Sequence, residues 1–126
     1  MFDGAGASDP MPLATAVGLG LVLLASGAIL AVVAFRSQRG TLPRNWIVGI
    51  RTTTTLASDE AWDAAHRAGA RALSTGAWGT AAAGMALLLR PSNGVGLAVI
   101  MAGLGWLLGW VFRAGYLGTR AARRED

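Results

Sequence analysis

One short segment of this chain holds most of the side chains that could do chemistry. Asp59, Asp63 and His66 follow one another at i, i+4 and i+7, so a helix would place them on successive turns. Two carboxylates and an imidazole could in principle hold a divalent metal. The threonine run 52–55 just before them could supply a hydroxyl nucleophile beside His66. Both sets are sparse, so we expect no catalytic residue, no metal site and no cofactor, and a protein that is not an enzyme.

Composition narrows the function further. Of the 126 residues, 53% are hydrophobic and 14% are charged, and the mean hydropathy is +0.47. The chain has no cysteine, which excludes a disulfide-stapled domain, a Cys-ligated metal centre and a Cys nucleophile. No Gly-rich phosphate loop and no nucleic-acid reader is visible, so we expect no nucleic-acid partner. High apolarity with sparse charge is typical of a membrane protein.

Three uncharged stretches flank the segment that holds the threonine run and His66, and they must position it. They predict an all-α membrane protein with three transmembrane helices. Residues 13–35 and 95–112 are both long enough to cross a hydrocarbon core, for which about 20 residues suffice. Residues 72–89 are rich in Ala and Gly and therefore weaker, so we expect them inside the bundle. Small residues allow membrane helices to approach closely. The pair Gly105 and Gly109 serves either packing within the chain or a homo-oligomer seam.

The arginines predict the orientation. With three crossings, ten of the eleven fall on one side of the membrane, and only Arg90 falls on the other. The positive-inside rule then leaves the tail 1–12 outside and places the loop 36–71 and the basic tail 113–126 in the cytoplasm. The link from Arg90 to Gly94 contains Pro91 and is predicted to be a turn.

The loop divides into two parts. Residues 42–56 are predicted to be extended or irregular, with Trp46, Ile47, Val48 and Ile50 in the membrane interface and basic residues at phosphate depth. Ser58 is a plausible N-cap for a helix that either runs on to Leu89 or bends at Gly69. On that helix the residues at helical spacing share one face, and Asp63 is placed to pair with Arg67. The shared face consists of Trp62, His66, Gly69 and Leu73.

The same segment resembles the SdpI family of bacterial integral membrane proteins, in its C-terminal module. The resemblance rests on LPRNWIVGIRT followed by TLASDEAWDAAHRAGA, with Thr53 where the family pattern has Pro. The residues that carry it are Arg44, Asn45, Gly49, Ile50, Arg51, Thr52, Thr55, Leu56, Glu60, Trp62, His66 and Arg67.

The resemblance implies a multi-pass protein of the bacterial inner membrane. Its family includes an immunity protein that protects a bacterium from its own secreted peptide toxin and recruits a transcriptional repressor. We therefore expect a protein that acts by binding membrane lipid, a peptide toxin, or a membrane or cytoplasmic protein partner. The alternative is a small accessory subunit of a larger inner-membrane complex.

We further expect Arg44 or Arg51 to pair with Glu60, and Trp62 to cover the loop as a lid. Polar groups at interface depth are costly unless they are paired. The resulting network, either a binding site or a structural clamp, would join Arg44, Asn45, Arg51, Thr52, Thr55, Glu60, Trp62, His66 and Arg67.

Overall fold

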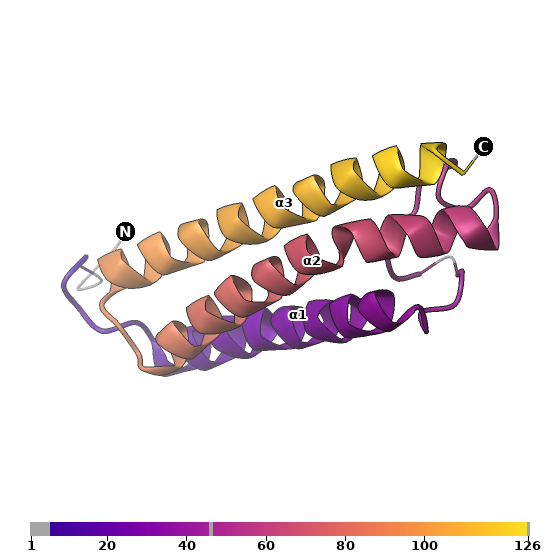
Figure 1. The fold of residues 1–126 in the computed structure, drawn as a ribbon. Coiled ribbons are helices and arrows are strands. Elements are labelled where there is room, and N and C mark those ends of the chain that lie inside the picture. Colours follow the sequence, from indigo (N-terminus) through magenta and orange to yellow (C-terminus); the bar gives the residue numbers. More distant parts are fainter. Residues whose placement is uncertain (1–5, 46, 126) are drawn as a thin grey trace.

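A computed structural model describes residues 6–45 and 47–125, so the expectation for Trp46 lies outside the described residues. Over these residues the chain forms three α-helices and no strand: α1 (Leu13–Arg39), α2 (Asp59–Leu88) and α3 (Asn93–Arg123). Figure 1 shows α2 between α1 and α3, with the segment 40–58 at the end of the bundle where α3 finishes. We call this end the loop end. The expected all-helical class is confirmed.

The helices α1 and α3 are apolar yet largely exposed. Both are long and apolar enough to cross a membrane, and only 28% and 11% of their most apolar stretches are buried within the chain. A core helix of a water-soluble protein would instead bury such a surface. α2 does not reach the same apolarity. It is the central helix, so much of its surface meets protein, and Ala and Gly suffice there.

Close backbone approach holds α2 against α1. A Cβ added at Gly84 would lie 2.7 Å from the carbonyl oxygen of Gly20, and one at Gly27 would lie 2.9 Å from that of Ala77. The predicted packing of small residues within the chain is therefore confirmed at this seam. It does not extend to Gly105, where an added Cβ would meet nothing within 4 Å.

The seam between α2 and α3 combines small and aromatic residues. Gly79 accommodates the indole of Trp106, whose Nε1–H donates to the carbonyl oxygen of Thr75 at 2.9 Å. Nearer the loop end, Ala122 packs against Ala61 and Ala65 of α2. This contact explains why α3 runs on to Arg123, beyond the span predicted to end at residue 112.

The opposite end of the bundle is closed by the segment that precedes α1. The Met11 amide donates to the Pro91 carbonyl at 2.9 Å, and the Arg90 Nε–H donates to the Met11 carbonyl at 2.7 Å. The predicted turn is present but shorter than expected. Ser92 caps α3 by accepting from the Val95 amide, so Asn93 already belongs to the helix.

Candidate functional site: the capped loop on α2

The segment from Gly40 to Ser58 leaves α1 at a left-handed glycine. Gly40 has φ of 69°, and the Thr41 amide behind it donates to the Arg36 carbonyl at 2.9 Å, which is a Schellman ending. The Arg67 guanidinium of α2 covers this turn, since a Cβ on Gly40 would lie 2.9 Å from its Nη2. The described residues do not form the expected local pair of Arg67 with Asp63.

The helix α2 begins as the sequence predicts. Ser58 has an extended backbone, and its hydroxyl oxygen accepts from the Ala61 amide at 3.0 Å. The helix continues without interruption to Leu88, past Gly69. The predicted shared face is confirmed, because Trp62, His66, Gly69 and Leu73 are all buried. The loop lies on the first part of that face.

His66 fastens the loop to α2. The Ile50 amide donates to His66 Nε2 at 2.9 Å, and Nδ1 lies 2.8 Å from the Trp62 carbonyl oxygen. A backbone N–H can only donate, so Nε2 must be the accepting, unprotonated nitrogen. Nδ1 then carries the hydrogen and donates to Trp62. The geometry therefore fixes His66 as the neutral Nδ1–H tautomer.

The pKa of His66 agrees with this assignment. Burial of the ring lowers the pKa below the ordinary value of 6.5, against smaller raising effects of the Trp62 carbonyl and of the Asp63 charge. Protonation would put a hydrogen on Nε2, the second on the ring, and this hydrogen would face the Ile50 N–H. The loop contact is thus specific for the uncharged ring.

Gly49 makes this approach possible. Its φ is 108°, a left-handed value that residues with a side chain rarely adopt. A Cβ there would lie 2.5 Å from His66 Nε2 and 3.1 Å from Trp62 Cη2. Both the backbone conformation and the space therefore require glycine at this position.

Two threonines shape the turn that follows. Buried Thr55 donates its hydroxyl to the Ile50 carbonyl at 2.7 Å and accepts from the Thr52 amide at 2.8 Å. In return, the Thr52 hydroxyl accepts from the Thr55 amide at 3.1 Å. The threonine run is therefore a hydrogen-bonded turn beside Ile50. The Thr55 hydroxyl is engaged in the structure of the loop, unlike the free nucleophile considered from sequence.

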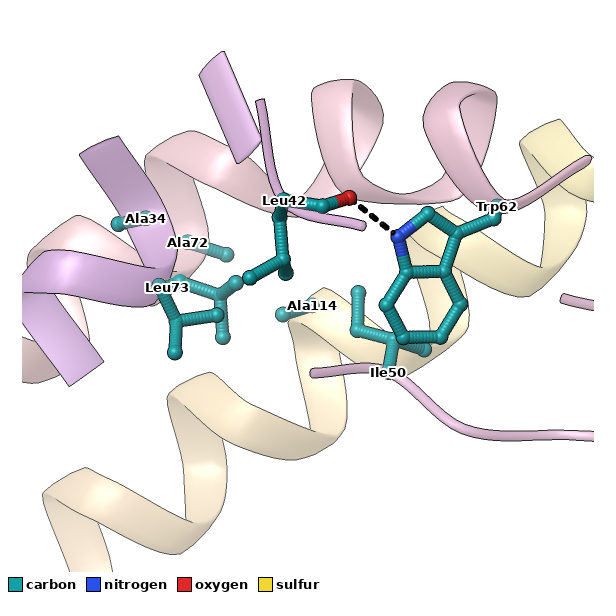
Figure 2. Close-up of a cluster of buried hydrophobic side chains, with 8 residues drawn as sticks. Ala34, Leu42, Ile50, Trp62, Ala72, Leu73 and Ala114 are labelled. Atoms are coloured by element: carbon teal, nitrogen blue, oxygen red, sulfur yellow. Dashed lines mark hydrogen bonds between the residues drawn. The ribbon is translucent and has the colours of Figure 1, made fainter. Parts of the chain in front are cut away.

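Trp62 lies beneath the loop rather than over it, so the expectation of a lid is wrong. Its side chain is 1% exposed, and its Nε1–H donates to the Leu42 carbonyl at 2.8 Å. Figure 2 shows this bond together with Leu42 and Ile50 of the loop and Ala114 of α3 around one apolar cluster. The indole ring also packs against the His66 ring, with centroids 4.1 Å apart. Trp62 is thus the buried side chain against which Leu42 and Ile50 of the loop pack.

Arg44 forms an ion pair, but with a different partner from the one expected. Its Nε lies 3.4 Å from Asp59 Oδ1, and its Nη1 donates to the Leu56 carbonyl at 3.1 Å. Glu60, the expected partner, is exposed. The pair ties the start of the loop to the first turn of α2. Since both side chains reach water, it adds about 1 kcal/mol at most.

The remaining predicted residues have separate roles. Asn45 accepts from the Ile47 and Val48 amides, both at 2.8 Å, which makes a local Asx turn. Arg51 is exposed at the loop end. Among residues 6–45 and 47–125, no group of three His, Asp or Glu side chains could hold a metal ion. The set of Asp59, Asp63 and His66 fails because both His66 nitrogens already have partners.

The segment that forms the loop and the helix beneath it also matches a known protein family. A family model described as the SdpI/YfhL protein family matches residues 41–113, more than half of the chain. The chain belongs to the SdpI/YfhL family. Searches of curated proteins and of solved structures gave no match.

The SdpI/YfhL match covers the loop, all of α2 and most of α3. It contains every residue that fastens the loop to α2 except Gly40. Sequence reasoning missed Leu42 and Asp59 as partners. Leu42 contributes a carbonyl oxygen, for which side-chain patterns carry no signal. Asp59 was visible as the first residue after the N-cap, where a carboxylate is favourable.

Proposed function

We propose that this SdpI/YfhL chain crosses the bacterial cytoplasmic membrane three times, with its N-terminus outside and its loop end in the cytoplasm. The exposed apolar surfaces of α1 and α3 support two of the crossings. α2 packs along both of these helices, so it would cross with them. Its uncharged part from residue 72 to Leu88 rises about 26 Å at 1.5 Å per residue, close to the hydrocarbon thickness.

Within this topology we propose that the protein acts by binding, as an immunity or sensing protein for a membrane-active peptide. The observation that carries the proposal is the loop fastened to α2 through Gly49, Ile50 and His66 within the family segment. It presents a surface of polar and apolar side chains, among them Arg44, Ile47 and Thr53, at one end of an apolar bundle. The chemistry-bearing groups His66 and Thr55 are already engaged in holding that surface, which favours recognition over catalysis.

A growth assay tests the peptide role. The full chain, expressed in a host that lacks it, is challenged with a panel of secreted membrane-active peptides. We expect it to raise the inhibitory concentration of at least one peptide, and Gly49→Ala to remove this protection at equal membrane levels. Thr53→Val, an exposed position in the same loop, is the matched control. Unchanged sensitivity across the panel would overturn the proposal.

A second candidate is an accessory subunit of a larger membrane complex. It is favoured by one face of α3, where a Cβ added at Gly105 or Gly109 would meet nothing within 4 Å. Small residues that face outward allow another helix to approach closely. Purification in mild detergent tests this candidate. A stoichiometric partner that is lost with Gly105→Leu would support it, and a chain recovered without a partner in both forms would contradict it.

A further inference from the structure

A groove opens between α1 and α3 at the loop end. Both helices pack against α2, and their backbones approach each other at very few positions. Leu73 of α2 and loop residues 47–52 line the space between them, which has a volume of about 860 Å³. We call this space the basic groove. It is within the size range of ligand sites in proteins, about 300–1,000 Å³.

The part of the basic groove farther from the loop end is apolar. Its walls are Ile29, Leu30 and Val33 of α1, Leu73 of α2, and Val111 and Phe112 of α3. Ile29 and Phe112 are 58% and 74% exposed, so the groove is continuous with the apolar outer surface of the bundle. In a bilayer this side would face hydrocarbon.

The mouth of the groove is cationic. Arg51 of the loop and Arg120 and Arg123 of α3 line it, and none of its described lining residues is acidic. Arg120 lies over the Tyr116 ring, 5.9 Å from the centroid, and its Nη1 donates to the phenol oxygen at 3.4 Å. The aromatic ring thus holds one guanidinium at the mouth. The guanidinium groups of Arg120 and Arg123, next to an apolar channel, complement a ligand with an anionic head and a hydrocarbon tail.

We propose that the basic groove binds one anionic phospholipid from the surrounding leaflet. An acyl chain lies along Ile29, Val33 and Phe112, and the phosphate lies between the guanidinium groups at the mouth. Guanidinium binds phosphate through two parallel hydrogen bonds, which an ammonium group cannot offer in that geometry. The inference rests on the membrane placement proposed above but is independent of the peptide role.

The test measures lipid retained by the full chain. The protein is reconstituted in nanodiscs of phosphatidylcholine with added phosphatidylglycerol, transferred to detergent, and analysed by native mass spectrometry. We expect one phosphatidylglycerol per chain in preference to phosphatidylcholine. The double variant Arg120→Gln with Arg123→Gln should lower the affinity by about 25-fold, at about fivefold for each arginine beside an anionic lipid.

Two matched controls separate the groove from general charge and from bulk. Arg36→Gln with Arg39→Gln removes the same charge from the loop-end turn of α1, outside the groove, and should leave retention within about twofold of wild type. Gly115→Leu places a side chain in the groove, whereas Gly105→Leu adds the same bulk on α3 outside it. An added Cβ meets nothing within 4 Å at either glycine. Only Gly115→Leu should displace the lipid.

Three results would overturn the proposal. The first is equal retention of phosphatidylcholine and phosphatidylglycerol by the wild-type chain. The second is equal loss in the groove variants and their controls, which would indicate a diffuse charge effect. The third is full displacement of the lipid by inorganic phosphate, which would indicate a simple anion site. Because the readout is bound lipid, failure here leaves the growth assay with peptides unaffected.

Discussion

The substitution Gly49→Ala is the sharpest perturbation of the loop. It adds a single methyl group where the backbone has φ of 108° and the added carbon would lie 2.5 Å from His66 Nε2. The ring and the loop cannot both keep their places. Either the loop moves away from α2, or the His66 ring turns and leaves the Ile50 amide without its acceptor.

Both responses are costly. A residue with a side chain in this backbone region costs about 1–3 kcal/mol. A buried amide that loses its partner costs about 1–3 kcal/mol more. The two together give about 2–6 kcal/mol, and we take about 3 kcal/mol as the working value. The contact between Ile50 and His66 should then open about 100-fold more often, at about 1.4 kcal/mol for each factor of ten.

Amide hydrogen exchange at Ile50 measures this opening directly. We expect its protection to fall about 100-fold in Gly49→Ala, while amides in the centre of α2 keep theirs. Gly115→Ala is the control, because a Cβ there meets open space. If Ile50 in Gly49→Ala stays as protected as in the wild type, the reasoning about Gly49 and His66 is refuted.

Three further outcomes are expected. Thr55→Val should destabilise the loop by about 1–3 kcal/mol in the same exchange assay, because it removes a buried hydroxyl that bonds to the Ile50 carbonyl and the Thr52 amide. Exposed Thr53→Val should change nothing measurable. Gly84→Ala should lower the stability of the bundle to detergent unfolding by about 1–3 kcal/mol, because the new carbon meets the α1 backbone. Gly18→Ala is the control, and this variant should be at least as stable as the wild type. The loop should be most stable above pH 6.5 and should lose stability as the pH falls below this value. The reason is that His66 binds a proton at a higher pH in the unfolded chain than in the folded loop. If amide exchange, corrected for the intrinsic rate, does not change between pH 7 and pH 5, the neutral ring is contradicted.

Local rules were enough to predict the helices and the buried face of α2. Ser58 caps the helix as its type suggests, and the spacing of Trp62, His66 and Gly69 identified the side that faces the core. Such signals depend on neighbours within two turns, so sequence alone carries them. The end of α3 was harder to predict, because the uncharged stretch that marks the span ends at residue 112. Only contact between distant segments, as at Ala122 against α2, explains the continuation.

The partners within the site could not be predicted in the same way. Charge and proximity favoured Glu60 for Arg44, but on a helix adjacent residues point about 100° apart, and Asp59 is the one that faces the loop. The bond to His66 comes from a backbone amide sixteen positions away. A main-chain donor leaves no mark in the residue types. The one residue type that reflects this bond is Gly49, and the sequence alone does not explain why glycine is needed there.

The neutral His66 that accepts from the Ile50 amide is the central claim, and nitrogen NMR of the labelled full chain in nanodiscs tests it most directly. Above pH 7 the account predicts the Nδ1–H tautomer and a scalar coupling across the hydrogen bond between the Ile50 nitrogen and His66 Nε2. An Nε2–H tautomer, an imidazolium ring at that pH, or the absence of the coupling in a folded sample would contradict it.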